Sequence, residues 1–543
     1  MTTFGIDLGT TYSCIAYVDE AGRATVVKNA LGEELTPSVV YFESADSVVV
    51  GREAKAVAKL FPKLVVSRIK REMGEDVAYV FHEKKHTPES VSALILRELA
   101  NAAEAETGEA VKDVVITVPA YFGVAQREAT RQAGRIAGFN VLNVVAEPVA
   151  AALHYEAMGK GEDRTILVFD LGGGTFDTTV IKIAGHDVQV VCTDGNHRLG
   201  GADWDDKIAD FLLDRFCDEN PGSTAADSEE FLQELALAAE DIKKALSATQ
   251  SRRYPMRFDG AICRAELTRV EFEAMASDLL QQTKDITERT IETARNKGAG
   301  TFDDVLLVGG SCRVPAVAAM LREGFGFEPR MHDPDQAVAK GAALFALIES
   351  VKVELPAETE GGVRPEFSED MVQAVADKLG TTASKVRELA AKKVATVVPR
   401  AFGVKVLDRH DDDPERRTFS IKHLLEANRA LPASPDTEQF YTAYPDQTEI
   451  EIEIWEQAGA VSSTDPADNN KIGAGMITGL PPLPSHSPVD VTFRMSETGL
   501  LRVEAVELKT AKGTNLELQI QMGLSEARVN EATSAVARYD VTE

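Results

Sequence analysis

Two short segments, far apart in the chain, each combine one aspartate with a turn of small residues. The first runs from Phe4 to Tyr12 and contains Asp7; the second runs from Leu167 to Asp177 and contains Asp170. In each, an apolar run predicts a strand that delivers the aspartate, and the glycines and threonines that follow predict a tight turn whose backbone N–H groups can bind an anion. The repeated unit predicts two similar lobes with a polyphosphate held between them.

A third strand-to-turn segment and one helix carry further candidate ligand groups. Val305–Val308 reads as a buried strand followed by two glycines, and Arg313 just beyond them is placed to stack on a base. The segment 239–247 has helical character, so Glu240, Lys243 and Ser247 share one face at i, i+3 and i+7. These three side chains could bind a ribose and a purine edge.

Composition limits the class of protein and its partners. The chain of 543 residues carries 58 basic and 87 acidic side chains, a net charge of -29, which disfavours nucleic acid and anionic membranes. The first residues enter a strand without a basic and apolar leader, and no apolar run is long enough for a membrane helix, so we expect a soluble, cytoplasmic protein. Five scattered cysteines without C-x-x-C spacing argue against disulfides and zinc.

Taken in order, the motifs of roughly residues 3–349 resemble the nucleotide-binding domain of the 70-kDa heat-shock chaperone family, the DnaK type. The matching motifs are 7–12, 116–121 with Gln126 and Arg127, 146–148, 170–177, 199–201, 240–247, 309–315 and 333–341. The resemblance implies an α/β, actin-like ATPase domain built from duplicated, ribonuclease-H-like lobes over residues 1–350.

The resemblance also implies ligands and roles. ATP or ADP and Mg²⁺ are expected, with K⁺ as a further candidate ion, and Asp7, Glu147 and Asp170 would hold the metal mainly through water. Lys70 and Thr175, with these three carboxylates, would serve hydrolysis. The remaining residues expected to contact the nucleotide are Gly9, Thr10, Thr11, Tyr12, Gly172, Gly173, Gly174, Gly200, Gly201, Glu240, Lys243, Lys244, Ser247, Gly309, Gly310, Ser311, Arg313 and Asp335.

Two further positions match residues by which the family relays the nucleotide state, Pro119 and Arg127. The chain also departs from the family pattern. Only a short stretch separates Gly74 from Thr87, where relatives carry a longer outer subdomain, and Asn143 stands where relatives with J-domain partners usually have arginine. A J-domain protein or an exchange factor is therefore a less secure expectation than an unfolded polypeptide.

Beyond residue 350 the pattern changes twice. Residues 351–393 read as a polar linker with a helical insert, and period-two alternation such as 450–454 then predicts an all-β domain over 394–523. This domain resembles the family's β-sandwich, with Phe440, Ala443, Ile450 and Ile452 lining a groove for an extended apolar peptide. Residues 407–414 form a charged loop where relatives place an apolar arch, and 524–543 predict a short helix with the family's helical lid absent.

Three functions are compatible with these features. The leading hypothesis is a lidless ATP-dependent chaperone that binds extended apolar segments of unfolded proteins and switches affinity by slow ATP hydrolysis. The alternative is an ATP-regulated adaptor or sensor for one dedicated partner protein, favoured by the altered linker and charged loop. A sugar or metabolite kinase on the same actin-like plan is a weaker third, because no feature requires a small substrate in the cleft.

Overall fold

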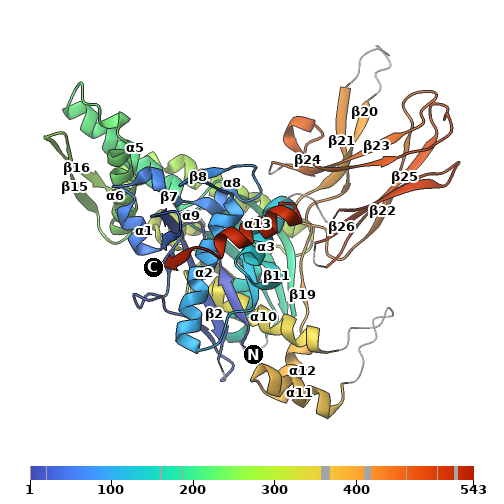
Figure 1. The fold of residues 1–543 in the computed structure, drawn as a ribbon, viewed down its shortest axis with the longest axis horizontal. Coiled ribbons are helices and arrows are strands. Elements are labelled where there is room, and N and C mark those ends of the chain that lie inside the picture. Colours follow the sequence, from blue (N-terminus) through green and yellow to red (C-terminus); the bar gives the residue numbers. More distant parts are fainter. Residues whose placement is uncertain are drawn as a thin grey trace.

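The computed structural model describes residues 2–19, 21–158, 162–185, 187–355, 367–408, 418–459, 461–497, 499–518 and 524–543. Two α/β lobes form its larger part, and a β-sandwich projects from them on one side (Figure 1). Most of the charged loop predicted at 407–414, part of the linker, and Gly523 fall outside the described residues.

Lobe I is built on a central sheet in the order β11-β10-β1-β2-β3. Strand β1 pairs antiparallel with β2 and parallel with β10, because a tight turn joins the first pair and a helical crossover precedes β10. A second sheet, β28-β6-β5-β7, lies outside it. The elements are β1 (Phe4–Asp7), β2 (Tyr12–Val18), β3 (Ala24–Val26), β4 (Thr36–Pro37), β5 (Val39–Phe42), β6 (Ser47–Val50), α1 (Arg52–Val57), β7 (Val65–Ser67), β8 (Tyr79–Phe81), β9 (Lys84–His86), α2 (Pro88–Thr107), β10 (Asp113–Val118), α3 (Val124–Ile136) and β11 (Asn140–Ala146).

Lobe II repeats this topology. Its sheet has the order β18-β17-β12-β13-β14, and its pairings match those of lobe I strand for strand, with β12 antiparallel to β13 and parallel to β17. The predicted duplication of the hairpin is therefore a duplication of the whole sheet. The elements are α4 (Glu147–Met158), β12 (Arg164–Leu171), β13 (Phe176–Ala184), β14 (Asp187–Asn196), α5 (Gly201–Glu219), α6 (Glu229–Ala248), β15 (Ser251–Phe258), β16 (Ala261–Thr268), α7 (Arg269–Met275), α8 (Ser277–Asn296), β17 (Asp304–Val308), α9 (Pro315–Phe325) and β18 (Pro329–Met331). Helix α10 (Ala337–Glu354) then crosses back and packs on β1 and β2 of lobe I and on α4.

The helical insert packs on the base of the lobes. Helices α11 (Glu369–Leu379) and α12 (Ala383–Ala391) bury Val372 and Leu389 in the core that also holds Val351 of α10. Strand β19 (Val394–Ala395) then adds itself, in parallel, to the edge of β14. Backbone pairing at a sheet edge fixes the start of the sandwich to lobe II.

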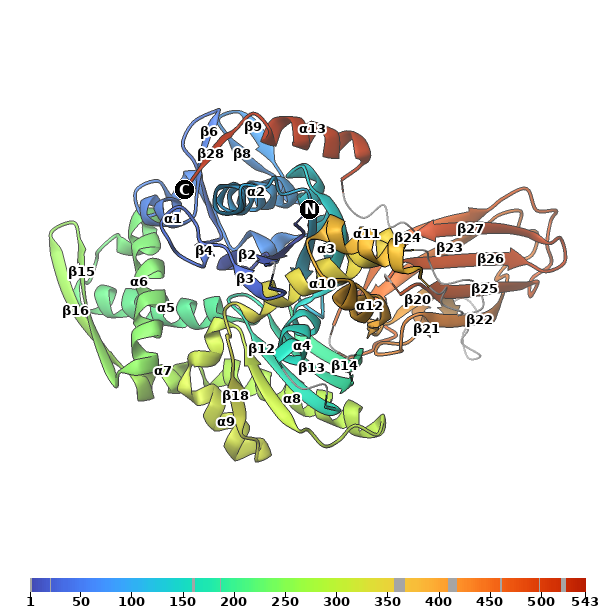
Figure 2. The ribbon, with the colours of Figure 1, turned by 90° about the horizontal axis from the view of Figure 1, so that it is seen from below.

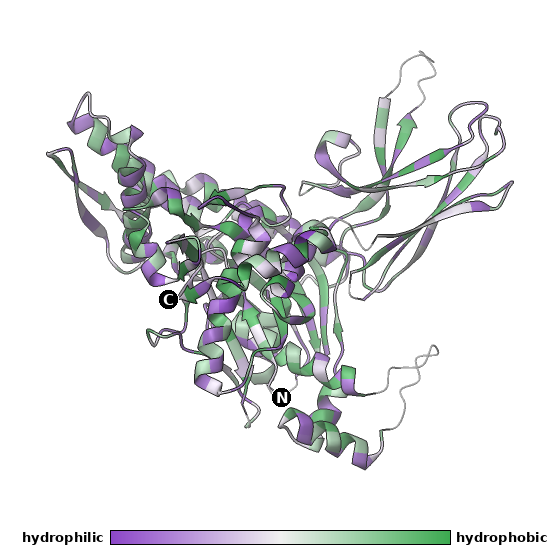
Figure 3. Ribbon diagram, viewed as in Figure 1, coloured by the Kyte–Doolittle hydropathy of each residue, from purple (hydrophilic) through white to green (hydrophobic). Residues whose placement is uncertain are grey.

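The sandwich consists of two four-stranded sheets, β21-β20-β23-β24 and β22-β25-β26-β27. Along β23 the isoleucines Ile452 and Ile454 are buried while Glu451 is exposed, as the period-two pattern predicts (Figure 3). The strands are β20 (Phe402–Asp408), β21 (Thr418–Leu425), β22 (Ala433–Tyr441), β23 (Ile450–Gln457), β24 (Asn469–Ile477), β25 (Pro488–Met495), β26 (Leu501–Glu507) and β27 (Lys512–Leu518).

The segment 524–543 returns to lobe I. Helix α13 (Glu526–Val536), predicted from sequence, is followed by strand β28 (Asp540–Thr542), which was not. Figure 2 shows α13 above α2 and β28 beside β6, far from the tip of the sandwich. The last described residues are thus part of the lobe I fold, and they do not lie over the sandwich.

Candidate nucleotide site

A cavity of about 400 Å³ lies between the two lobes. Both glycine-bearing hairpins reach it, as do α6 and the turn after β17. Twenty of the predicted residues line it: Asp7, Gly9, Thr10, Thr11, Tyr12, Lys70, Glu147, Asp170, Gly172, Gly173, Thr175, Glu240, Lys243, Lys244, Ser247, Gly309, Gly310, Ser311, Arg313 and Asp335. The predicted Gly174, Gly200 and Gly201 are not in its lining and lie directly behind it.

The two hairpins face each other in close contact. A Cβ atom placed on Gly173 would lie 2.1 Å from Thr11 Oγ1, and one on Gly174 would lie 2.4 Å from Thr10 Oγ1. Gly200 backs the second hairpin, because a Cβ there would lie 2.6 Å from the Gly174 backbone. Glycine is required here by close approach, which leaves backbone N–H groups and threonine hydroxyls as the surface offered to a ligand.

Four carboxylates lie close to the Lys70 ammonium group: Asp7, Glu147 and Asp170 line the inner end of the cavity, and the buried Asp177 lies behind them. Lys70 Nζ lies 2.5 Å from Glu147 Oε1, and Thr117 donates to Asp7 Oδ1 at 3.1 Å. Burial and then the Glu147 charge raise the pKa of Asp7 to about 7, and burial raises the pKa of Asp170 well above its usual range. Burial lowers the pKa of Lys70, but the charges of Glu147 and Asp7 outweigh it and raise the pKa above its ordinary value. The cluster therefore holds more carboxyl groups than its one lysine can neutralise, and burial favours the protonated forms of Asp7 and Asp170 in the ligand-free protein.

The fourth carboxylate, Asp177, gives a pH-dependent prediction for the ligand-free protein. Burial and then Glu147 raise its pKa from 3.8 to about 7. A carboxyl group with a raised folded pKa contributes stability that is present below its unfolded pKa and is lost as pH rises through the folded value. As pH rises from 4 to 7, the free energy of unfolding of the wild type should therefore fall further than that of Asp177→Asn. The two decreases should differ by on the order of 2 kcal/mol.

Urea unfolding at pH 4, 5.5, 7 and 8 would measure this difference. The amide oxygen of the variant can still accept the Tyr121 N–H, which lies 3.0 Å from Asp177 Oδ1. Asp210→Asn, a change at an exposed position, is the control and should follow the wild type. Parallel pH profiles for the wild type and Asp177→Asn would show that Asp177 titrates normally.

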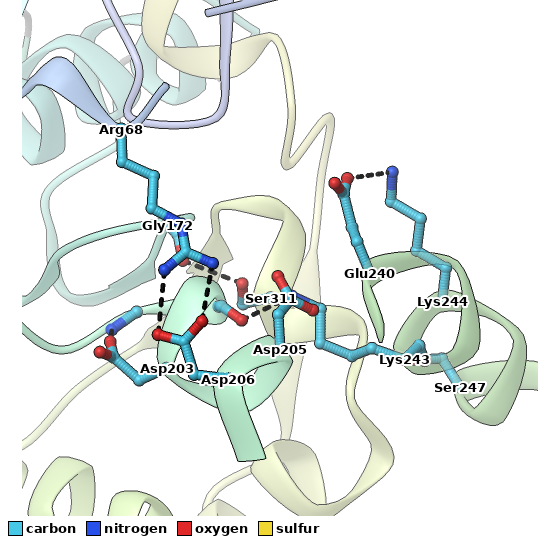
Figure 4. Close-up of polar contacts among 12 residues, drawn as sticks. Arg68, Gly172, Asp203, Asp205, Asp206, Glu240, Lys243, Lys244, Ser247 and Ser311 are labelled. Carbon is cyan, nitrogen blue, oxygen red and sulfur yellow. Dashed lines mark hydrogen bonds and ion pairs between the residues drawn. The ribbon is translucent and has the colours of Figure 1, made fainter. Parts of the chain in front are cut away.

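At the outer end of the cavity, charged side chains from both lobes meet above Tyr12. Its hydroxyl donates to Glu240 Oε1 at 2.8 Å and accepts from Lys244 Nζ at 2.9 Å, while Lys55 pairs with the other Glu240 oxygen. Burial opposes ionisation of Glu240, but Lys55 and Lys244 lower its pKa to about 2. In Figure 4 a dashed line joins Glu240 to Lys244, and both side chains project from the same helix, α6.

Deeper along α6, Lys243 is held by groups of lobe II. Its ammonium lies 2.8 Å from Asp205 and donates to the Gly201 carbonyl at 2.7 Å, and Ser311 Oγ donates to the Gly172 carbonyl (Figure 4). Arg313 pairs with Asp335 across the turn after β17. Sequence reasoning missed Lys55 and Asp205. Neither stands in a recognisable motif. Asp205 of α5 lines the cavity, and Lys55 of α1 lies outside the lining and contacts Tyr12 and Glu240.

The loop that carries Pro119 lies behind the carboxylate cluster and contacts the sandwich. The Arg127 guanidinium stabilises the loop by donating hydrogen bonds to the carbonyls of Ala120, at 3.1 Å, and Phe122, at 3.0 Å. On the sandwich side, Arg400 donates to the Tyr121 carbonyl at 2.9 and 3.1 Å, and Glu456 accepts from the Val124 N–H at 3.1 Å. Arg400 and Glu456 are both almost fully buried, so this is a tight polar contact between the domains.

The four predicted peptide-contacting residues lie apart from the cavity, in the sandwich. Ile452 is only 9% exposed and belongs to the core between the two sheets, where Phe440 and Ile450 pack beside it partly buried. Ala443 is half-buried in the turn after β22. The structure therefore places Ile452 inside the sandwich and leaves the other three with surface open to solvent.

Comparison with known proteins supports the resemblance read from the motifs. The family model described as "Hsp70 protein" matches residues 3–81, 76–357 and 415–543. The chain belongs to the Hsp70 family. It is 34% identical to the chaperone protein DnaK of Thermosipho melanesiensis, and 33% identical to that of Thermotoga petrophila, over 99% of this chain and 83% of each relative.

Membership of the Hsp70 family fixes the fold class and the activity class. The chain is an ATPase with an actin-like domain and a β-sandwich, and it is an ATP-dependent chaperone that uses adenine nucleotide with Mg²⁺. Within the described ranges, no helix combines the length and the apolar character that a membrane span requires.

Proposed function

We propose that this Hsp70 protein binds extended apolar segments of unfolded polypeptides in its sandwich and changes its affinity for them through slow ATP hydrolysis between its lobes. The observation that carries the proposal is the loop 119–123. Tyr121 donates its N–H to Asp177 in the carboxylate cluster, and its carbonyl accepts from Arg400 of the sandwich. One short loop thus contacts both the expected hydrolysis site and the expected peptide domain.

Asp7, Glu147 and Asp170 would hold Mg²⁺, mainly through water. The cluster fits a divalent cation because its carboxylates outnumber Lys70 and because Asp170 Oδ2 is buried without a hydrogen-bond partner among the described residues. Bound Mg²⁺ would neutralise charge on the phosphate oxygens. A set of ligands made only of oxygen atoms favours a hard cation such as Mg²⁺ over softer metals.

The two hairpins would enclose the phosphates. Backbone N–H groups of Gly9 to Thr11 and Gly172 to Thr175 provide donors on both sides, and Lys70 provides the positive charge nearest the reacting phosphoryl group. Thr175, 6% exposed at the cavity wall, would orient the attacking water. Among the described residues that line the cavity there is no histidine to act as a general base, which agrees with slow turnover.

The outer end of the cavity would take the nucleoside. Glu240, Lys243, Lys244 and Ser247 of α6 would bind the ribose and one edge of the purine. Arg313, held by Asp335, would stack on the base together with the backbone of Gly309 to Ser311. Binding would exchange the present Lys244–Tyr12 contact for contacts with the ligand.

Pro119 and Arg127 would relay the nucleotide state. Lys70 Nζ lies 6.0 Å from the Phe122 ring centre, so a shift of the lysine toward a phosphate acts on the loop that Arg127 holds. Because Arg400 and Glu456 grip the same loop, its displacement would weaken the docking of the sandwich. Coupling of this kind requires that each ligand favour one of the two arrangements.

The peptide site itself can be tested with Ile450→Asp. Ile450 is partly exposed beside Phe440, and an aspartate there would place a charge in an apolar groove. We expect the affinity for a fluorescent leucine-rich heptapeptide to fall about 10-fold or more, because burial of one such side chain contributes roughly 1.5–3 kcal/mol. Fluorescence anisotropy in ADP would measure it.

The control for this test lies one residue further along β23. Glu451→Gln changes an exposed position on the opposite face of the strand and should bind the peptide as the wild type does. ATP turnover without peptide should be the same in all three proteins. Equal peptide affinity for Ile450→Asp and the wild type would contradict this site and favour an adaptor that binds one folded partner elsewhere.

A further inference from the structure

The segment 524–543 is buried in lobe I as firmly as the lobe's own elements. Val529, Val536, Tyr539 and Val541 are at most 7% exposed and belong to one core with Phe42, Val48 and Phe81 of lobe I. Strand β28 pairs with β6 over Asp540↔Ser47 to Thr542↔Val49. Figure 2 shows this strand completing the outer sheet beside β6.

Polar contacts hold the helix of this segment in one position. Glu526 accepts two hydrogen bonds from Arg135 of α3, at 2.9 and 2.8 Å. Gln132 both accepts from the Leu524 N–H at 2.8 Å and donates to the Leu524 carbonyl at 3.1 Å. Paired donors and acceptors of this kind fix the position and orientation of α13 on α3, and they add to the effect of its buried apolar side chains.

The end of the segment reaches the base of α1. The Glu543 carboxylate accepts from Asn29 Nδ2 and from the Ala30 N–H, the latter at 3.0 Å. It also lies against Gly51, the residue before α1, where a Cβ would be 3.2 Å from Glu543 Oε1. Strand β6, which β28 pairs with, ends at Val50, directly before this glycine.

Helix α1 carries a lobe I side chain, Lys55, that joins Tyr12 in contacting Glu240 of lobe II. Lys55 Nζ pairs with Glu240 of lobe II and lies 3.2 Å from the Tyr12 hydroxyl. Tyr12 and Glu240 both line the cavity. A continuous set of contacts therefore runs from β28 through β6 and Gly51 to Lys55 at the nucleoside end of the site.

We propose that residues 524–543 are a positioning element of the ATPase domain: by docking on lobe I they set α1, and so Lys55, against Tyr12 and Glu240. The proposal rests on the assignment of this cavity to adenine nucleotide. It extends that assignment, because it makes nucleotide affinity depend on residues that touch neither the cavity nor the sandwich core. The helix after the sandwich thus serves the nucleotide site.

The test is the affinity of full-length variants for a fluorescent ADP analogue with Mg²⁺. Val541→Asp puts a charge into the lobe I core under β28 and should weaken binding about 10-fold, while Arg538→Ala, at an exposed position of the same segment, should leave it unchanged. Lys55→Met should weaken binding by a similar factor. In the Lys55→Met background, Val541→Asp should add less than 3-fold, because both changes act through the same contact.

A chain that ends at residue 523, mixed with a synthetic peptide of residues 524–543, provides the second measurement. Added peptide should restore nucleotide affinity to within about 3-fold of the full chain, whether the shortened chain is folded or needs the peptide to fold. Full affinity of the shortened chain without peptide, or independent, multiplicative effects of Val541→Asp and Lys55→Met, would overturn the proposal. Failure of the wild-type chain to bind nucleotide would instead overturn the assignment of the cavity.

Discussion

Replacing Lys70 by alanine should lower saturated ATP turnover by about 10²- to 10³-fold while nucleotide still binds. Lys70 is the cation of the buried carboxylate cluster, where its ammonium is 4% exposed and contacts Glu147. Without it, the transferring phosphoryl group loses the protein charge nearest to it, while the glycine hairpins and α6 still hold the rest of the nucleotide. Single-turnover hydrolysis of radiolabelled ATP, with a separate binding titration, would measure the two effects.

Lys244→Ala is the matched control for that experiment. Lys244 is also a lysine of the cavity wall, but its side chain is 55% exposed and lies at the nucleoside end beside Glu240. We expect this variant to bind nucleotide more weakly but to hydrolyse it, at saturation, within about 3-fold of the wild type. The reason is that Lys244 would contact the bound nucleotide equally in the ground state and in the transition state. Normal turnover by Lys70→Ala would show that the assignment of Lys70 to hydrolysis is wrong.

Arg400→Ala should uncouple the sandwich from the lobes. Arg400 is 2% exposed and donates two hydrogen bonds to the Tyr121 carbonyl, and its guanidinium lies 3.9 Å from the buried Glu456 carboxylate. Its removal leaves a carbonyl and a carboxylate unpaired in the interface, at a cost of about 3–5 kcal/mol to docking. We expect ATP turnover to become insensitive to an apolar peptide that alters turnover in the wild type.

Two further variants decide whether the effect comes from the interface. Arg400→Ala combined with Glu456→Gln should regain part of the coupling, because it also removes the charge left unpaired. Lys405→Ala changes a cation of β20, the strand that follows Arg400. Lys405 pairs with Glu453 inside the sandwich, and this variant should remain coupled. Faster hydrogen exchange at residues 119–124 in Arg400→Ala would confirm undocking, whereas full peptide sensitivity in that variant would contradict the interface described here.

The sequence predicted the cavity well because its decisive features are local. In each hairpin the aspartate, glycines and threonines are neighbours in the chain, so residue type alone predicts a turn that offers N–H groups. The close approach of Gly173 to Thr11 and of Gly174 to Thr10 explains why those positions must be small. The side chains on α6 were predictable from helical spacing once the helix was recognised.

What the sequence did not predict depends on contacts between distant segments. Strand β28 is three residues long, and nothing in Asp540–Thr542 identifies β6 as its partner. Lys55 contacts Tyr12 and Glu240, which lie 43 and 185 residues away in the chain, so no local pattern identifies it. Ile452 was predicted to contact peptide, and how much of it is open to a ligand depends on how the second sheet packs; it is 9% exposed, and its peptide contact stays a prediction.

The measurement that tests the central claim most directly is the affinity of one short apolar peptide for the wild-type chain with ATP and with ADP. If the loop 119–123 joins the nucleotide cluster to the sandwich, the two dissociation constants should differ by about 10-fold or more, which corresponds to a coupling free energy of roughly 1.4 kcal/mol. Equal dissociation constants in ATP and ADP would contradict it.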